Sequence, residues 1–227
     1  MQSKLYPLQE NYEADYELVE RNQLTTDSIS VNSPTKIDLS APALSRPADR
    51  PLNGIGERGD PVVLGNLTKD EKRRKQELWD IYGINHFLSD KISLHRALRE
   101  FRHPLCVDRS PFNYKKLPNT SVIIVFYNEG WSTLLRTIYS VLHNTPDILL
   151  EEIILIDDGS TIDNLGKELH DYIANLPKIK LIRTGRREGL MRARLLGLAQ
   201  AVGEVVAFVD CHCECTHGWL EPLLEGI

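Results

Sequence analysis

The sequence predicts an α/β fold in which a mainly parallel sheet is built from strands that alternate with helices. Two observations predict it: four short apolar runs rich in β-branched residues, and amphipathic segments that separate them. Continuous apolar runs are typical of strands buried on both faces, and parallel neighbours need a crossover connection. We therefore expect right-handed βαβ units that form an α/β nucleotide-binding half-domain.

Each predicted element has its own local pattern. Thr68 and Glu71 have the spacing of a capping box, and Gly83 is suited to end the helix that they begin. The strands are expected at 122–126, 153–156, 179–182 and 205–209. The intervening helices are expected at 131–144, 162–176 and 188–202, and another helix begins near 219.

Two of these helices carry further local patterns. Ser132 is expected to cap the helix at 131–144, because a hydroxyl near the first turn can accept an orphan backbone N–H. The helix at 188–202 places one set of apolar residues on a single face: Met191, Leu195, Leu198 and Val202.

The chain divides into three parts by composition. Residues 1–60 hold five of the twelve prolines and show no sustained period, so they are expected to be a disordered linker. Residues 61–117 are predicted to be a helical and extended lead-in. Residues 118–227 carry the strand and helix pattern of the nucleotide-binding part.

Charge and hydropathy narrow the functional classes. The net charge of −5 over 227 residues argues against a nucleic-acid partner, which calls for a broad basic surface. No apolar run reaches the roughly 18 residues that span a bilayer, and the first residues lack the apolar core of a signal peptide.

A glycine pattern at 54–59 matches the dinucleotide fingerprint by its letters alone. That fingerprint works only between a strand and a helix, where the helix N-terminus meets the pyrophosphate. Here Pro51 precedes it and Pro61 follows it closely. A dinucleotide site is therefore not expected.

Acidic residues end the second predicted strand. Asp157 and Asp158 lie at the carboxyl edge, where open parallel sheets bind ligands, and they can accept hydrogen bonds from a nucleotide or help to hold a cation. A helix-capping turn is the alternative, since Asp, Gly and Ser are all turn residues. Two adjacent aspartates after an apolar strand favour the functional interpretation.

The fourth predicted strand ends in a run of acidic residues, cysteines and a histidine. If the strand stays extended, Asp210, His212 and Glu214 face one way and the cysteines the other. A carboxylate and an imidazole spaced in this way can chelate Mn²⁺. Structural zinc usually takes two separated ligand pairs, and Cys106 is the only other cysteine, so a closed zinc site is not expected.

Arginines precede the third predicted helix of the sheet. Arg186 and Arg187 lie at a helix start, where positive charge opposes the helix dipole. A bound phosphate or sugar would explain them, and a solvated charge is the alternative.

Taken together, these motifs resemble the polypeptide N-acetylgalactosaminyltransferase family, retaining enzymes with a GT-A fold and a glycosyltransferase family 2-like domain. The resemblance covers roughly residues 60–227. Its segments are 82–85, 88–94, 101–106, 117–121, 126–137, 152–158, 187–194, 208–215 and 219–224.

The resemblance implies a function and roles for residues. The family transfers N-acetylgalactosamine from UDP-GalNAc to Ser or Thr of proteins in mucin-type O-glycosylation. Asp210 and His212 would be ligands of Mn²⁺, while Asp158, Arg187 and Cys211 would bind the donor. Residence in the Golgi lumen behind a type II membrane anchor is also implied.

The chain departs from the family pattern at several points. Tyr127 replaces a common histidine, and Val125 a common threonine. The family pairs the cysteine that matches Cys106 with a downstream cysteine, which is absent here.

We expect the chain to hold only the UDP- and Mn²⁺-binding half. The signal anchor, a third metal ligand, the acceptor-binding half and the lectin domain are missing from it, so little turnover is expected. The alternative is an inactive remnant that binds or regulates a full-length relative.

Overall fold

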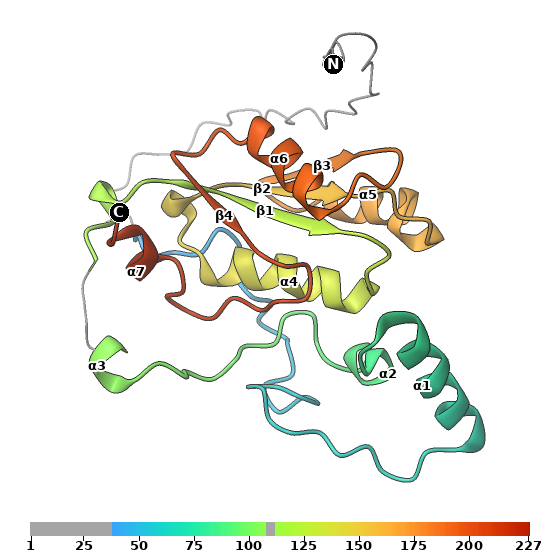
Figure 1. Ribbon diagram of the computed structural model, residues 1–227. Helices are drawn as coiled ribbons and strands as arrows, with labels where there is room; N and C mark the ends of the chain where they lie inside the picture. The colour runs from blue at the N-terminus through green and yellow to red at the C-terminus, as the bar shows by residue number, and fades with distance from the viewer. Residues whose placement is uncertain (1–37, 108–111) are drawn as a thin grey trace, which may run out of the picture.

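The computed structural model describes residues 38–107 and 112–227, with a four-stranded parallel sheet at its centre (Figure 1). The strands are β1 (Thr120–Phe126), β2 (Leu150–Asp157), β3 (Ile179–Arg183) and β4 (Val205–Phe208). The α-helices are α1 (Lys69–Tyr82), α2 (His86–Ser89), α3 (Pro104–Val107), α4 (Trp131–Asn144), α5 (Lys167–Ile173), α6 (Leu190–Gln200) and α7 (Glu221–Leu224). Three short 3-10 helices complete the described elements: η1 (Tyr114–Lys116), η2 (Asp147–Leu149) and η3 (Asp163–Leu165). The predicted α/β class with a parallel sheet is confirmed.

The order of the strands across the sheet is β3-β2-β1-β4. The chain moves outward from β1 to β2 and β3, and then returns to the other side of β1 for β4. This reversal makes a topological switch point between β1 and β4, and open α/β sheets bind ligands outside the carboxyl ends of the strands at such a point. The loops after β1 and β4 therefore meet where a ligand is expected.

Helices cover both faces of the sheet, with α4 and α6 on opposite sides (Figure 1). Val122, Ile124 and Phe126 of β1 pack with α4 and α5, whereas Ile123 packs with α6, since neighbouring side chains in a strand point to opposite faces. All four side chains are at most 1% exposed. The prediction that this apolar run is a strand buried on both faces is confirmed.

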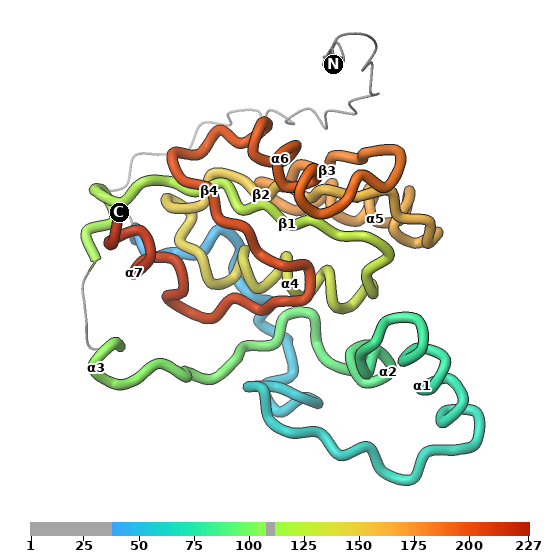
Figure 2. The backbone as a smooth tube through the Cα atoms, viewed as in Figure 1, coloured from blue at the N-terminus to red at the C-terminus, as the bar shows by residue number. Residues whose placement is uncertain are grey.

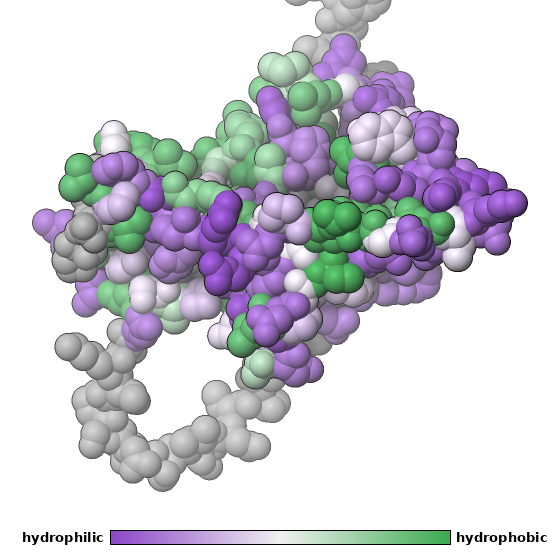
Figure 3. Space-filling view, turned by 90° about the horizontal axis from the view of Figure 1, so that it is seen from below, coloured by the Kyte–Doolittle hydropathy of each residue, from purple (hydrophilic) through white to green (hydrophobic). Residues whose placement is uncertain are grey.

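Helix α1 begins and ends as its sequence predicts. The Thr68 hydroxyl accepts a hydrogen bond from the backbone N–H of Glu71, whose carboxylate accepts one from the N–H of Thr68. Gly83 ends the helix in the left-handed conformation, with φ 69°. Most of the outer surface of α1 is charged, and the molecule seen from below is mainly hydrophilic with separate hydrophobic patches (Figure 3). Within the described ranges, no helix is long and apolar enough to cross a membrane.

The predicted cap of α4 is wrong. The residue at the N-cap position is Gly130, and Ser132 already lies within the first turn. The Ser132 hydroxyl instead donates to Asp90, 2.7 Å away, and lies 2.8 Å from the hydroxyl of Ser89. The Ser132 hydroxyl therefore forms tertiary contacts with α2 and its C-cap residue, and it does not cap α4 as the sequence predicts.

Helix α6 presents its predicted apolar stripe away from the sheet. Met191, Leu195, Leu198 and Val202 lie on one side of this segment, but they are 69%, 62%, 46% and 70% exposed. The buried residues of α6 are Ala193 and Gly197, and a Cβ added at Gly197 would lie 2.7 Å from a methyl group of Ile123. Because the helix approaches the sheet closely, Ala193 and Gly197 lie against it together with the half-buried Leu196, and the predicted stripe faces outward.

Residues 1–37 of the predicted linker lie outside the described residues. Residues 38–60 lack helices and strands, yet part of this segment runs beside α4 (Figure 2). Ala43 donates its backbone N–H to the carbonyl of Thr145, and Leu44 donates to that of Leu142, both at 3.1 Å. Backbone hydrogen bonds, which leave no periodic pattern in the side chains, hold this segment on the domain.

A contact between the buried His143 and the half-buried His95 joins that segment to the lead-in. His143 of α4 lies with Nδ1 2.8 Å from the carbonyl of Leu44 and Nε2 3.0 Å from Nδ1 of His95. His143 is 4% exposed. Burial first, and then the nearby charges of Arg46 and Arg50, lower the pKa of His143 to about 4. The imidazole is therefore neutral at neutral pH and can join both neighbours.

The His143 contact makes the stability of the domain pH-dependent. In the unfolded chain the imidazole of His143 has a pKa near 6.5, and in the folded protein its pKa is about 4. The free energy of folding that depends on the neutral imidazole is therefore complete above about pH 6.5. It is lost as the pH falls from 6.5 toward 4, because the unfolded chain then binds a proton that the folded protein does not. We expect urea unfolding to show a loss of about 2 kcal/mol at pH 5 relative to pH 7 from this group.

The variant His143→Gln separates this effect from other titrations. Its free energy of unfolding should depend less on pH over the same range, because the group that gains a proton on unfolding is gone. His217→Gln, at an exposed histidine, is the matched control and should keep the wild-type dependence. An unchanged dependence in His143→Gln would contradict the assignment.

Candidate functional site

The carboxyl ends of the four strands form one edge of the sheet. Phe126 pairs with Asp157 and Asp157 with Arg183 in the parallel register, so β1, β2 and β3 end side by side. Every predicted site residue follows one of these strands or β4, and the structure brings all of them to this edge: Asp158, Arg187, Asp210, Cys211 and His212.

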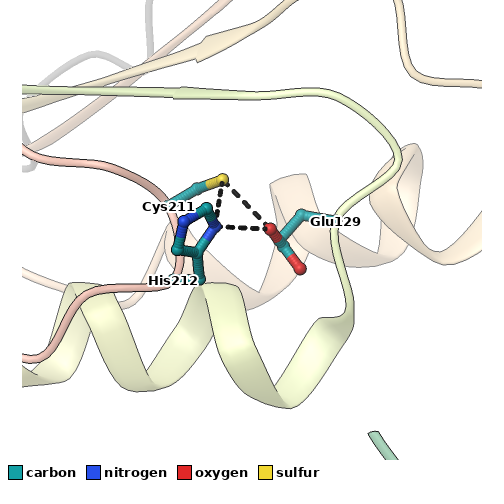
Figure 4. A group of neighbouring side chains, drawn as sticks. All are labelled: Glu129, Cys211 and His212. Carbon is teal, nitrogen blue, oxygen red and sulfur yellow. Dashed lines mark hydrogen bonds and ion pairs between the residues drawn. The ribbon is translucent and has the colours of Figure 1, made fainter. Parts of the chain in front are cut away.

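Three side chains meet at the switch point between β1 and β4. Glu129 follows β1, while Cys211 and His212 follow β4 (Figure 4). The Oε2 atom of Glu129 lies 3.1 Å from Sγ of Cys211 and 3.3 Å from Nδ1 of His212, and Sγ lies 3.8 Å from that nitrogen. A carboxylate, a thiol and an imidazole thus converge in a group that we call the Glu129 cluster.

Hydrogen bonds with α4 and its N-cap hold two members of the Glu129 cluster in place. The second oxygen of Glu129 accepts the N–H of Gly130 at 2.8 Å, at the start of α4. The carbonyl of Cys211 accepts the hydroxyl of Thr137, also in α4, at 2.9 Å. Burial, together with the charge of Glu129, raises the pKa of the Cys211 thiol. The thiol therefore stays protonated and donates to the carboxylate.

The predicted alternation of side chains after β4 is wrong. The strand ends at Phe208, and the chain then turns, with the N–H of Cys213 donating to the carbonyl of Asp210 at 3.1 Å. The turn places Cys211 beside His212 rather than on the opposite face. Glu214 leaves the site and pairs with Arg96. Side chains alternate between two faces only in an extended backbone, and the backbone turns after Phe208.

Asp210 lies at the same edge but outside the Glu129 cluster. Its carboxylate is 56% exposed and pairs with Arg194 of α6 at 3.1 Å. The His212 side chain is 58% exposed. An exposed ion pair contributes little free energy, so a cation can displace Arg194. Oxygen and nitrogen donors two residues apart suit a cation such as Mn²⁺, and Asp210 and His212 fit this chemistry.

Asp158 has the contacts of a capping residue in this structure. It is 2% exposed, and its oxygens accept the backbone N–H groups of Glu188 and Gly189, at 2.7 and 3.0 Å. Asp157 is also buried; it accepts the N–H of Ser160 at 2.8 Å and pairs with Arg183. The capping turn, which the sequence left as an alternative, describes these contacts, and they hold the loop before α6 against the end of β2.

Arg187 is exposed and lies over an aromatic ring. Its guanidinium carbon is 3.6 Å from the centroid of Tyr127, which follows β1 and is 40% exposed. Within residues 38–107 and 112–227, no carboxylate forms an ion pair with Arg187. Stacking on Tyr127 fixes the guanidinium plane while its N–H groups stay available to an anion.

Two residues of this edge were not predicted as site residues from the sequence. Glu129 and Tyr127 both follow β1, as Asp158 follows β2, and their position after an apolar strand is the signal that could have marked them. Their partners depend on which strands are neighbours. That order is absent from the local pattern of residues.

Two cavities of about 440 and 490 Å³ lie against α1. The first is lined by residues that include Tyr82, His86 and Trp131. Neither cavity is lined by Arg187 or by the residues after β4. The candidate site residues after β3 and β4 therefore lie outside both of these cavities.

Known proteins resemble the part of the chain that contains the sheet and the candidate site. Residues 121–227 match the family described as Glycosyl transferase family 2. The chain is 54% identical over 186 residues to polypeptide N-acetylgalactosaminyltransferase 12 of Mus musculus. This alignment covers 82% of the chain and 32% of that relative. It is 52% identical over 191 residues to polypeptide N-acetylgalactosaminyltransferase 4 of Mus musculus, covering 84% of the chain and 32% of the relative. The chain thus spans about a third of the length of these relatives.

A solved structure has the same arrangement of elements. The crystal structure of GalNAc-T7 with UDP, GalNAc and Mn²⁺ matches with a TM-score of 0.72 and 37% identity. The match covers 87% of this chain and 36% of that one. The parallel sheet and its helices are therefore the GT-A fold of that protein over the shared region.

Proposed function

Because the chain belongs to the polypeptide N-acetylgalactosaminyltransferase family, we propose that its sheet edge binds UDP-N-acetylgalactosamine in a Mn²⁺-dependent manner. The proposal rests on the charged and polar side chains that gather at the carboxyl edge of the parallel sheet. An exposed arginine follows β3, and an exposed carboxylate and imidazole follow β4, beside the switch point of the sheet. A nucleoside diphosphate offers the negative charge that such an edge attracts.

The contacts proposed for Asp210, His212 and Arg187 follow from their exposure and chemistry, and that of Cys211 from the family resemblance. Asp210 and His212 would hold Mn²⁺, with Asp210 released from Arg194. Arg187, held flat on Tyr127, would donate hydrogen bonds to the diphosphate or the sugar. Cys211 would lie against the donor. When bound, Mn²⁺ would supply Lewis-acid neutralisation of the charge on the departing UDP.

Asp158 would be a positioning residue more than a direct contact. Its carboxylate is 2% exposed and already accepts two backbone N–H groups. Those amides belong to Glu188 and Gly189, which directly follow Arg187 in the chain. By holding this loop, Asp158 would set where the guanidinium of Arg187 meets the donor.

The proposed reaction is that of mucin-type O-glycosylation. The sugar of the bound donor would pass to a Ser or Thr hydroxyl of a protein or peptide, and UDP would leave. Golgi residence in the lumen is proposed with the same function. The related crystal structure, which holds UDP, GalNAc and Mn²⁺, supports the choice of donor and metal.

Calorimetry on the 227-residue chain tests the proposal. We expect UDP to bind in the presence of Mn²⁺, and we expect its affinity to fall by at least about tenfold in excess EDTA, because the metal would bridge the protein and the diphosphate. UDP-N-acetylgalactosamine should compete with UDP, and GDP should compete poorly. Equal UDP binding with and without Mn²⁺, or none in either condition, would contradict it.

A second candidate function is a non-catalytic partner of a full-length relative. The observation that favours it is an apolar stripe formed by Met191, Leu195 and Leu198 of α6 and by Val202 just after the helix, each at least 46% exposed. Exposed apolar patches of this kind mark interaction surfaces. Co-purification with a full-length transferase that persists in Asp210→Ala, but is lost in Leu195→Glu, would favour this function.

A further inference from the structure

The chain contains two Asn-X-Ser/Thr triplets that the proposed function does not use: Asn66-Leu67-Thr68 and Asn119-Thr120-Ser121. In a secretory compartment, such a triplet is the acceptor of an N-linked oligosaccharide when it lies at the surface. We infer that Asn66 carries an N-linked oligosaccharide and that Asn119 does not. The inference rests on the lumenal residence that is proposed with the function.

Asn66 lies in an open part of the structure. The segment 61–68 before α1 has no helix or strand and runs away from the sheet (Figure 1). Asn66 is exposed, and within residues 38–107 and 112–227 its side-chain amide has no hydrogen-bond partner. A Cβ added at the neighbouring Gly65 would meet no atom within 4 Å. An oligosaccharide on the Asn66 amide therefore displaces no hydrogen bond of the folded chain.

Thr68 supplies the hydroxyl that the oligosaccharyltransferase must reach. This hydroxyl accepts the N–H of Glu71 at 3.2 Å and donates to the Glu71 carboxylate at 3.0 Å, within the capping box of α1. Thr68 is exposed, and the end of a helix opens at little cost in free energy. The hydroxyl is therefore released whenever the first turn of α1 opens.

A cavity beside this triplet leaves room for the first sugars. It has a volume of about 490 Å³ and is lined by Leu67, the residue next to Asn66. Trp79, which is 50% exposed, forms part of its wall, and the other lining residues are polar: Lys72, Lys75, Gln76 and Asn85. A sugar ring has apolar C–H faces and hydroxyl edges, which match an indole bordered by amine and amide groups. The cavity thus gives the sugars a surface to lie on.

Asn119 is held at both atoms of its amide. Its Nδ2 donates to the carboxylate of Glu151 at 2.9 Å, and its Oδ1 accepts the N–H of Glu204, also at 2.9 Å. Ser121, the third residue of this triplet, lies in β1 and is 0% exposed. Its hydroxyl donates to Glu152 at 2.9 Å. The folded protein therefore excludes an oligosaccharide at Asn119.

The modification forms one bond and breaks another. Nδ2 of Asn66 attacks the anomeric carbon of the first sugar in a lipid diphosphate oligosaccharide, and one amide proton passes to a base of the oligosaccharyltransferase. The bond between that carbon and the diphosphate oxygen breaks, and its electron pair leaves with the lipid diphosphate. The amide keeps one N–H, and no oxidant or reductant takes part.

Translation of the 227-residue chain behind a cleavable signal peptide, in the presence of microsomes, tests the inference. We expect one oligosaccharide per chain, seen as a gel shift that peptide N-glycosidase reverses. Asn66→Gln should abolish the shift, and so should Thr68→Ala. Thr68→Ser keeps the hydroxyl and the helix cap, so it should retain the shift. Asn119→Gln is the matched control and should shift like the wild type.

An unmodified wild-type chain, two oligosaccharides per chain, or a shift that survives in Asn66→Gln and is lost in Asn119→Gln would overturn the inference. The result is separable from the proposed function, because the signal peptide supplies entry into the lumen and the readout needs no UDP. A chain modified at Asn66 that shows no Mn²⁺-dependent UDP binding would support the inference and contradict that function. UDP binding by a chain that microsomes leave unmodified would do the reverse.

Discussion

Replacing Asp210 with alanine is expected to weaken Mn²⁺-dependent binding of UDP by at least about 100-fold. Under the proposed function, Asp210 supplies the carboxylate ligand, and one imidazole holds a divalent cation poorly. The fold should tolerate the change, because the side chain is 56% exposed and its ion pair with Arg194 lies at the surface. Calorimetry with UDP, at fixed excess Mn²⁺, measures the difference.

Two further variants sharpen this test. Asp171→Ala removes another exposed aspartate that pairs with a cation, Lys167, and should leave UDP binding unchanged. Arg194→Ala frees the Asp210 carboxylate, so UDP should bind as tightly as to the wild type or more tightly. If Asp210→Ala binds UDP like the wild type while both proteins are folded, Asp210 is not a metal ligand.

Replacing Gly159 with alanine is expected to destabilise the domain by about 3 kcal/mol or more. Gly159 lies after β2 with φ +76°, where a side chain costs roughly 1–2 kcal/mol. Its added Cβ would also lie 2.5 Å from the carbonyl carbon of Arg186 and 2.6 Å from the nitrogen of Arg187. Backbone atoms cannot rotate away, and such overpacking costs a further 1–3 kcal/mol or so.

Gly185→Ala provides the matched control for this effect. Gly185 has φ +69°, but a Cβ there would meet no atom within 4 Å. It should therefore cost only the conformational penalty, about 1–2 kcal/mol. Urea unfolding measures both variants. We also expect Gly159→Ala to weaken UDP binding, because the loop that carries Arg187 must move. Equal destabilisation in the two variants would show that the contact with this loop is unimportant.

Much of the fold could be predicted from local patterns. The apolar run of β1, the stripe of α4 and the caps of α1 each depend on residues a few positions apart, so the sequence contains them in full. The edge that carries the candidate site was also predictable, because the carboxyl ends of parallel strands lie together whatever their order.

Predictions failed where a distant residue competed with a local rule. Ser132 lies within the first turn of α4, and Asp90 takes the hydrogen bond of its hydroxyl. The apolar stripe of α6 faces outward, because Ala193 and Gly197 let the helix approach the sheet more closely. Hydrophobic periodicity predicts that a helix has an apolar and a polar face. Which face is buried also depends on how closely the helix packs against the sheet.

The sequence by itself determined the class of the fold, the strands and the edge at which chemistry-bearing residues gather. Only the tertiary structure decided that β4 lies beside β1, that the chain turns after Phe208, and that Glu129 therefore meets Cys211 and His212. The physical reason is the range of the interactions. Strand and helix patterns arise between near neighbours, whereas strand order and the meeting of loops more than 80 residues apart depend on the packing of the whole domain.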